Sequence, residues 1–395
     1  MLTISNVVKK SIEATSVRYN NIVYELKQKG INPTVLSLGE AFFDIPLFDM
    51  KDLPFPQLYH YSHSRGIPAL REKICDYYSS HYNVSVNQES EIIITAGSKA
   101  AIYFALRSVL NPGDEAIVVE PAWVSYPEQI KLCFATPVMI PHWENVFNYE
   151  KYITAKTKII IINNPNNPSG KVYSKKELTY LVNLAQSKNL YILSDEAYSD
   201  FLLDDTFYSC GLFDEQKRNI IICNSISKNF GISGWRIGYS ITNKDLTNQI
   251  LKLNQHIITC PATILGFYLA KYFDEIIKIT YPQIKAIVET RKKVGQFMDS
   301  IGLSYLPGTA TFYFFISTKP SLLTSEEFCT RLLLEENIAA VPGIGYGPTC
   351  DSFIRISVGT EPLEKIQAAL VGIKKFIERT ASPIISANKS LHASR

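Results

Sequence analysis

The chain has 395 residues, of which 46% are hydrophobic and 19% charged, and its formal net charge is +3. This balance is that of a globular protein and excludes intrinsic disorder. The small net charge, without a basic run that carries aromatic residues, argues against a nucleic-acid partner.

The cysteines and the apolar runs indicate where the protein works. Seven cysteines are scattered along the chain without a Cys-x-x-Cys pair. We therefore expect no disulfide framework, no zinc or other metal site, and a reducing compartment. No apolar run reaches the ~18 residues of a membrane span, and the start lacks the apolar core of a secretory signal. We expect a cytoplasmic protein with no membrane partner.

Short apolar runs alternate with amphipathic stretches through the middle of the chain. This alternation is typical of an α/β fold with a mostly parallel sheet. The predicted strands are 91–96, 116–120, 137–140, 158–163, 190–194, 219–224 and 236–242. The predicted helices between them are 98–110, 125–132, 175–187 and 244–256.

After Pro282 the apolar residues keep a helical period, which predicts a connecting helix. The alternation of strands and helices then takes a different pattern. Further strands are predicted at 311–316, 338–341 and 353–358, with helices at 325–336 and 361–379. We expect a large domain at 46–284 and a smaller domain formed by 1–45 together with 285–380. The tail 381–395 lacks an apolar period, and we expect it to be loose.

Polar residues follow several predicted strands, at the edge where open α/β sheets place their ligands. Gly97 lets the backbone approach a ligand, and the N–H groups of Ser98 and Lys99 at a helix start suit a phosphate. Taken alone, this segment is better explained by an ordinary N-cap at Ser98. The spacing is neither Walker A nor Gly-x-Gly-x-x-Gly, so a nucleotide site is not favoured.

Three further segments hold rigid side chains at this edge. Trp123 can stack on a flat ring or belong to the core. Asn167 lies in an Asn-Pro turn, where its amide can donate to a ring oxygen or merely shape the turn. Asp195 ends an apolar strand, where a carboxylate needs a partner such as a protonated pyridine nitrogen, unless it caps the next helix.

Lys228 follows an apolar run that we predict to be a buried strand, a poor place for a solvated charge. Ser225, Ser227 and Arg236 around it suggest a bound phosphate beside a reactive amine, which could hold an aldehyde cofactor as a Schiff base. Each residue alone has a structural explanation, but their joint placement favours the cofactor. Arg355, on a strand with apolar neighbours, can clamp a substrate carboxylate or form a structural pair.

With these segments in this order, the chain resembles the class I aminotransferases, most closely the bacterial aspartate and aromatic branch. These are fold type I pyridoxal 5'-phosphate enzymes, with a large domain around a mostly parallel seven-stranded sheet and a smaller α+β domain from both termini. The resemblance covers nearly the whole chain from about Leu36. It implies an enzyme that moves an amino group between an L-amino acid and a 2-oxo acid in a ping-pong cycle, with pyridoxamine phosphate as the halfway form.

The resemblance also assigns roles to residues. Lys228 would form the Schiff base and shuttle the proton, Asp195 would pair with the pyridine nitrogen, and Tyr198 with Asn167 would contact the ring hydroxyl. The ring would stack on Trp123, and the phosphate contacts would be Gly97, Ser98, Lys99, Ser225, Ser227 and Arg236. The substrate would meet Arg355, the backbone near Gly39, Asn167 and Trp123.

Tyr61 matches a family tyrosine that reaches the phosphate of the neighbouring subunit, which implies a homodimer with shared sites. From the sequence alone Tyr61 could equally be a core residue.

The substrate stays open because two signals disagree. Lys99 matches a position that in some relatives helps to bind a distal carboxylate, and so allows aspartate or glutamate. Ala41 and Phe42 replace the Pro-Asp of the branch's Pro-Asp-Phe, and Phe42 with Phe43 favours an apolar or aromatic side chain.

Two alternatives remain beside the aminotransferase. A lyase, cyclase or oxidase would use the same cofactor and the same lysine. A non-catalytic regulator would need a DNA-binding domain, and the roughly 35 residues before the first motif carry no helix-turn-helix pattern.

Overall fold

The computed structural model describes residues 2–381 of the chain, and its centre is a seven-stranded sheet. The strand order is β2-β8-β7-β6-β5-β3-β4, and only β8 runs antiparallel to its neighbours. The strands are β2 (Ile92–Thr95), β3 (Glu115–Val119), β4 (Thr136–Ile140), β5 (Thr157–Asn163), β6 (Tyr191–Asp195), β7 (Ile220–Ser225) and β8 (Gly238–Ile241). The predicted α/β architecture with a mostly parallel sheet is confirmed.

Both faces of the sheet are covered by helices, which explains why its strands are continuously apolar. Along β5, Ile160 and Ile162 point into one buried cluster, whereas Ile159 and Ile161 point into the other. The first face is covered by α3 (Pro68–Tyr82), α6 (Lys175–Lys188) and the start of α9 (Thr263–Ser300). The second is covered by α4 (Gly97–Val109), α5 (Ser125–Leu132) and α8 (Lys244–Ile257).

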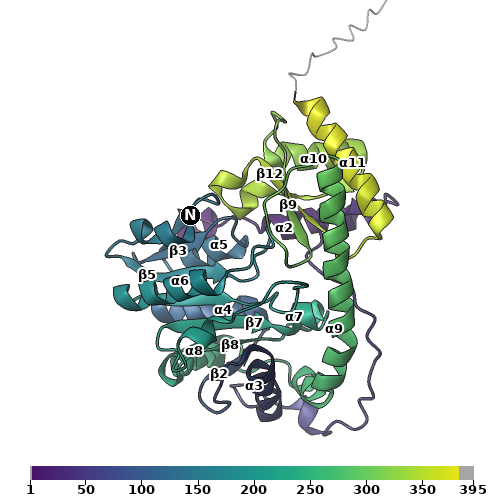
Figure 1. Ribbon diagram of the computed structural model, residues 1–395. Coiled ribbons are helices and arrows are strands. Elements are labelled where there is room, and N and C mark those ends of the chain that lie inside the picture. The colour runs from purple at the N-terminus through teal and green to yellow at the C-terminus, as the bar shows by residue number, and fades with distance from the viewer. Residues whose placement is uncertain (1, 382–395) are drawn as a thin grey trace, which may run out of the picture.

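The long helix α9 corrects the expectation of a connector that begins after Pro282. The helix starts at Thr263 and continues past Pro282, with one non-helical residue at Tyr272. In Figure 1 this helix runs along one side of the molecule, from the sheet to the part that holds β9 and β12. Its early residues, such as Phe273, join the core below the sheet, whereas Ile284 and Val288 join a second core.

Around the second core the two ends of the chain meet. The strand β1 (Thr34–Val35) pairs with β10 (Ile338–Ala339), and β11 (Val341–Pro342), β12 (Phe353–Ser357) and β9 (Tyr313–Ser317) form an antiparallel sheet. The helices of this part are α2 (Thr15–Gln28), α10 (Ser325–Glu336) and α11 (Leu363–Thr380), while the short α1 (Asn6–Lys10) contacts α5.

We propose the division into 46–284 and 1–45 with 285–380 as two domains. It is supported by the change of core along α9 near residue 284 and by the pairing of β1 with β10. The predicted loose tail lies, from residue 382 onwards, outside the described residues. None of the helices between residues 2 and 381 combines the length and hydropathy of a membrane span.

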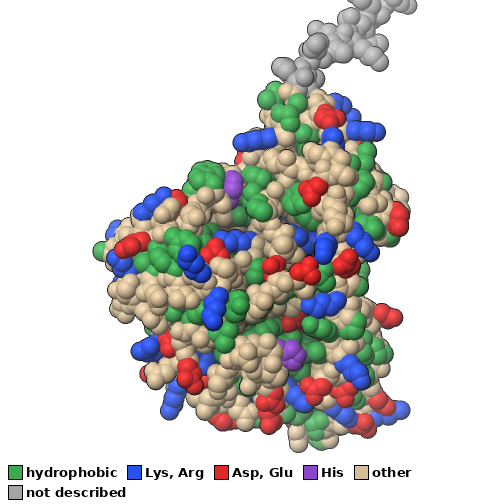
Figure 2. Space-filling model, in the orientation of Figure 1, with side chains coloured by type: hydrophobic (Ala, Val, Ile, Leu, Met, Phe, Trp, Pro, Cys, Tyr) green, Lys and Arg blue, Asp and Glu red, His purple; other side chains and the backbone are tan. Residues whose placement is uncertain are grey.

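The surface charges are mixed on the face of the molecule that Figure 2 shows. Lysine and arginine side chains stand among aspartate and glutamate side chains over this face. The mixture agrees with the small net charge of +3.

Candidate active site

A cavity of about 390 Å³ lies at the carboxyl ends of β5, β6 and β7, the edge where parallel sheets place their ligands. Every site residue predicted from the sequence lines it except Gly97 and Tyr61. Four basic residues and two acidic ones border the cavity: Lys99, Lys228, Arg236, Arg355, Glu40 and Asp195. This excess of positive charge suits an anionic ligand.

Lys228 lies on a single helical turn, α7 (Ile226–Asn229), rather than at the end of the strand itself. The turn begins where Ser225 ends β7 and its hydroxyl accepts the N–H of Ser227 at 3.3 Å. This turn directs the lysine into the cavity, where Nζ donates to the carbonyl oxygen of Gly39 at 2.6 Å.

The surroundings of Lys228 differ from those of Lys217, a buried lysine. Lys217 pairs with Glu91 at 3.0 Å and donates to the carbonyl oxygen of Ser85 at 2.8 Å. No carboxylate oxygen of residues 2–381 lies within 4.0 Å of the Lys228 amine. Burial, reinforced by the charges of Arg355 and Arg236, lowers the pKa of Lys228 to about 8. Lys228 is thus an amine that loses its proton readily.

Asp195 ends β6, beside Lys228 on the same strand edge. Its Oδ2 accepts the hydroxyl of Tyr126 at 2.6 Å and its Oδ1 accepts the N–H of Ala197 at 3.2 Å. Burial raises the pKa of Asp195 to about 6, and the hydrogen bond from Tyr126 opposes that rise. The sequence interpretation missed Tyr126, although it stands on α5 one turn after Trp123.

A group of hydroxyl and amide side chains lies next to Asp195. The hydroxyls of Tyr198 and Tyr313 are 3.0 Å apart, and Nδ2 of Asn167 donates to Tyr198 at 3.3 Å. Oδ1 of Asn163 accepts the backbone N–H of Asn167 at 2.6 Å, which fixes the Asn-Pro turn against the end of β5. Neither Tyr313 nor Asn163 was singled out in the sequence. Tyr313 comes from β9, so only the tertiary fold brings it here.

Arg355 stands on β12 and enters the cavity from the opposite side. It is 3% exposed, and Nη2 donates to the carbonyl oxygen of Ser37 at 2.7 Å. Its guanidinium carbon lies 4.5 Å from the ring centre of Tyr313. Nε has no hydrogen-bond partner, and no carboxylate of residues 2–381 pairs with the guanidinium. A buried guanidinium in this condition is suited to an anionic ligand.

The start of α4 and the loop before β8 approach each other closely enough to exclude side chains. Gly97 has φ +76°, and a Cβ there would collide with Nη2 of Arg236. A Cβ at Gly238 would overlap the backbone nitrogen of Ser98. Arg236 precedes β8 in a left-handed conformation, not within a strand as expected, and Nη1 donates to the carbonyl oxygen of Ser233 at 2.7 Å. Ser98, Arg236 and the N–H groups of a helix start thus gather at one end of the cavity, as an anion site requires.

The rim of the cavity holds residues that the sequence interpretation did not consider. Ala14, Ser16, Val17 and Asn20, at the start of α2, line it. Lys99 also lines the cavity, and its Nζ is 5.3 Å from the ring centre of Trp123.

Phe42, Phe43 and Tyr61, like Gly97, do not line the cavity. Phe42 is exposed, and Phe43 packs beside Gly231 and the second core, so neither lines the cavity. The expectation of an apolar or aromatic side chain, which rested on these two residues, therefore gains no support from the cavity of a single chain. Tyr61 is 86% exposed and borders a separate apolar depression with Phe267.

Comparison with known proteins identifies the family. The model for "Aminotransferase class I and II" matches residues 48–373. The chain belongs to this family. It is 33% identical to an aspartate aminotransferase of Bacillus sp. strain YM-2, over 95% of this chain and 99% of that protein. It is 31% identical to aromatic-amino-acid aminotransferase 2 of Thermococcus litoralis, over 87% of this chain and 91% of that protein.

Solved structures give the same result. The Thermus thermophilus aspartate aminotransferase with maleate is 28% identical, has a TM-score of 0.86 and aligns with 95% of this chain and 100% of that one. The fold is accordingly that of the fold type I aminotransferases, the resemblance drawn from the sequence is confirmed, and the chain is an aminotransferase. Members of this family depend on pyridoxal 5'-phosphate.

Proposed function

We propose that the cavity binds pyridoxal 5'-phosphate and that Lys228 carries the chemistry of an aminotransferase acting on an L-amino acid and a 2-oxo acid. The observation that carries the proposal is the Lys228 amine, which faces the cavity without a carboxylate partner and has a pKa lowered to about 8. A lysine in this state is suited to bond an aldehyde.

The residues around the cavity fit this cofactor from end to end. Gly97, Ser98, Ser225, Ser227 and Arg236 would hold the phosphate, because they supply a helix start, hydroxyls and a guanidinium at one end. Asp195 would hold the ring nitrogen in its protonated form. Trp123 would cover the ring, and Asn167 with Tyr198 would hold the ring hydroxyl.

The bound cofactor supplies an aldehyde that condenses with amines and a cationic ring that accepts electrons from the substrate Cα. The chain contributes placement and proton transfer. Arg355 would bind the substrate carboxylate, together with the backbone near Gly39. Nζ of Lys228 would take the proton from Cα, which it can do as a neutral amine at pH values near its pKa.

The substrate side of the cavity favours a second negative charge. Lys99 borders the cavity, and no carboxylate of residues 2–381 pairs with it. We propose that Lys99 serves the phosphate end and also reaches the side-chain carboxylate of aspartate or glutamate. Trp123 and the start of α2 leave an apolar flank, in line with relatives named for aspartate and for aromatic amino acids.

We further propose a cytoplasmic homodimer. Tyr61 is exposed and lies outside its own chain's cavity, as a residue that reaches a neighbouring subunit's phosphate would. The cysteines of residues 2–381 are all free thiols, which supports a reducing compartment.

A single-turnover experiment tests the reaction. The cofactor-loaded enzyme is mixed with one amino acid and no oxo acid acceptor, and both the oxo acid and ammonia are measured. Transamination predicts that at most one equivalent of 2-oxo acid forms per subunit and that no ammonia is released. Continuous oxo acid production with equimolar ammonia would contradict it and identify a lyase or oxidase.

A further inference from the structure

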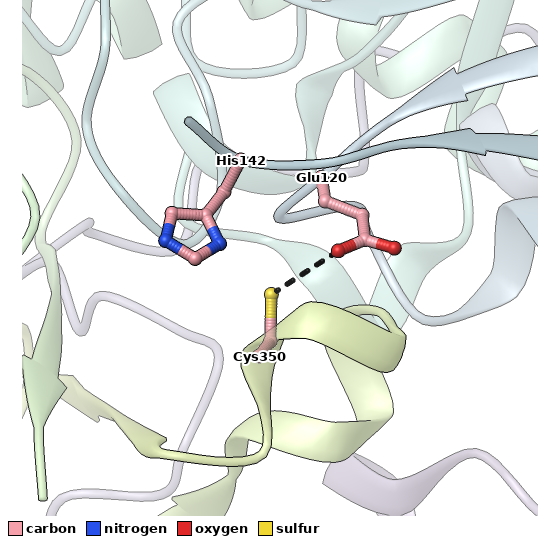
Figure 3. A group of neighbouring side chains, drawn as sticks. All are labelled: Glu120, His142 and Cys350. Carbon is pink, nitrogen blue, oxygen red and sulfur yellow. Dashed lines mark hydrogen bonds between the residues drawn. The ribbon is translucent and has the colours of Figure 1, made fainter. Parts of the chain in front are cut away.

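Outside the cavity, three side chains with metal-binding atoms point toward one another (Figure 3). Glu120 directly follows β3, His142 follows β4, and Cys350 ends the short helix η6 (Pro348–Cys350). One ligand atom from each lies within 4.8 Å of the other two. The cluster joins the edge of the large sheet to the C-terminal part of the chain.

Glu120 is an unusual member because its carboxylate is buried without a counter-charge. It is 4% exposed, and Oε2 accepts the N–H of Thr349 at 3.1 Å, the hydroxyl of Thr349, and the thiol of Cys350 at 3.9 Å. All three donors are neutral, and no basic side chain of residues 2–381 lies within 4.0 Å of the carboxylate. A buried carboxylate of this kind is stabilised by a cation.

The geometry points to a zinc ion as that cation: we propose that Glu120, His142 and Cys350 bind one Zn²⁺ per chain. Thiolate, imidazole and carboxylate are the ligands that zinc takes in proteins. Tetrahedral bonds of the usual lengths would place a sulfur and an oxygen ligand about 3.5 Å apart. The Cys350 sulfur and Oε2 of Glu120 are 3.9 Å apart, so a small movement closes the site.

Thr349 contacts two of the three proposed zinc ligands and precedes the third in the sequence. Its hydroxyl donates to Glu120 and lies 3.0 Å from Nδ1 of His142. On zinc binding this hydroxyl stays beside the ligands as a hydrogen-bond partner. In the metal-free chain the Cys350 thiol donates a hydrogen bond to Glu120. Formation of the Zn–S bond therefore releases that thiol proton to solvent.

A small cavity borders the cluster. Glu120 and His142 line a cavity of about 110 Å³, together with Glu144, Asn166 and Lys171. This volume has room for water molecules, one of which could complete the four-coordinate zinc.

The site would tie together segments that reach the active-site cavity. The backbone N–H of Ala122 already donates to the carbonyl oxygen of Tyr346 at 2.8 Å. Ala122 lies between Glu120 and Trp123 in the sequence, and Tyr346 shortly precedes Cys350. Bound zinc would fix the loop that carries Trp123 against the segment before Arg355. Its role is thus structural, and the proposal does not depend on which substrate the cavity takes.

The absence of Cys-x-x-Cys pairs led us to expect no zinc site, but that argument covers only ligands that are close in sequence. These three residues stand at positions 120, 142 and 350. Only the tertiary structure brings them together.

Zinc content tests the proposal directly. The cofactor-loaded enzyme is stripped with a chelator, loaded with excess Zn²⁺, passed over a desalting column and analysed for metal. We expect one zinc per chain. His142→Ala or Cys350→Ser should weaken zinc affinity by more than about 100-fold. Removal of a partner outside the ligand shell lowers metal affinity by about 10–100-fold, and removal of a ligand should lower it further. Thr349→Val retains all three ligands, so its zinc affinity should fall by no more than about 100-fold.

Two matched variants serve as controls. Cys133→Ser removes an equally buried thiol that lies in another part of the core, and Glu144→Gln removes a carboxylate that lines the same small cavity. Both should retain one zinc per chain. Replacement of zinc by Co²⁺ should add the visible bands of four-coordinate cobalt, at longer wavelength than the cofactor, in the wild type and both controls but not in Cys350→Ser.

Two results would overturn the proposal. One is wild-type enzyme that leaves the column without stoichiometric zinc, which is decisive even if the ligand variants fold poorly. The other is zinc that remains at one per chain after His142→Ala and Cys350→Ser. Neither result bears on the aminotransferase reaction, which the single-turnover experiment tests separately.

Discussion

The hydroxyl of Tyr126 donates a 2.6 Å hydrogen bond to Oδ2 of Asp195, and both residues are buried. This bond favours the ionised form of Asp195, whose pKa burial raises to about 6. It joins α5 to the end of β6, and it leaves Asp195 as a carboxylate at neutral pH, in the form that would pair with a protonated ring nitrogen.

We predict that Tyr126→Phe raises the pKa of Asp195 further and lowers kcat by about tenfold or more, because a hydrogen bond to a charged group contributes about 1.5–3 kcal/mol. The acidic limb of the pH–kcat profile should move to higher pH. Tyr149→Phe removes the hydroxyl of another tyrosine that is equally buried but does not line the main cavity. That control should leave the profile in place, and an unchanged profile in Tyr126→Phe would contradict the assignment.

Lys228→Ala should lower activity by roughly 10²–10⁴-fold, the contribution of general acid–base catalysis, and abolish the visible absorption band of the lysine-bound cofactor. The protein should remain folded, which gel filtration and the thermal unfolding midpoint can check. If Lys228→Ala kept both its activity and the visible absorption band, another residue would carry the chemistry.

The lowered pKa of Lys228 gives a separate prediction in the cofactor-free protein. A base with a pKa of about 8 is neutral in about a tenth of molecules at pH 7, against about 0.03% at its ordinary pKa of 10.5. The rate of cofactor incorporation should therefore rise about tenfold per pH unit below pH 8 and level off above it. Stopped-flow absorbance between about pH 6 and pH 10 measures this. A rate that still rises steeply above pH 9 would mean an unperturbed lysine.

Arg355→Lys should raise KM for the amino acid and lower kcat/KM by about 10²-fold, because the charge remains but the bidentate fork is lost. Arg291 offers a matched control, since it is equally buried but its guanidinium donates to the carbonyl oxygens of Tyr313 and Ser169. Arg291→Lys should lower the thermal unfolding midpoint while KM stays near the wild-type value. Equal KM effects in the two variants would assign Arg355 to structure.

Lys99→Ala separates the two substrate classes. If Lys99 reaches a side-chain carboxylate, kcat/KM for aspartate and glutamate should fall by about tenfold or more, and for phenylalanine much less, because only the acidic substrates lose a charged hydrogen bond. If Lys99 also contacts the phosphate, its loss lowers kcat/KM for every donor, and the ratio of kcat/KM for aspartate to that for phenylalanine cancels this shared effect. An equal fall for all donors would place Lys99 at the phosphate alone.

Local pattern was sufficient to predict the sheet and much of the site. The apolar runs that became β5, β6 and β7 each pack on both faces, so their continuous hydrophobicity was a direct sign of buried parallel strands. Lys228, Asp195 and Asn167 follow such strands, and the carboxyl ends of neighbouring parallel strands share one edge. Their meeting in one cavity follows from those facts.

Other features depend on contacts between segments far apart in the sequence. Nothing near Phe42 shows that its ring faces solvent, and nothing near Pro282 shows that tertiary packing carries α9 across it. Tyr313 and the start of α2 reach the cavity only because the second core holds both ends of the chain together.

The sequence by itself therefore determined the fold class, the family and the residues that follow each strand, because strand burial and helix starts are encoded within a few neighbouring positions. The tertiary structure alone decided that Arg355 is buried without a carboxylate, that Tyr126 holds Asp195, and that Glu120, His142 and Cys350 converge. Each of these depends on distances between atoms of remote segments, which are fixed only when both cores have packed.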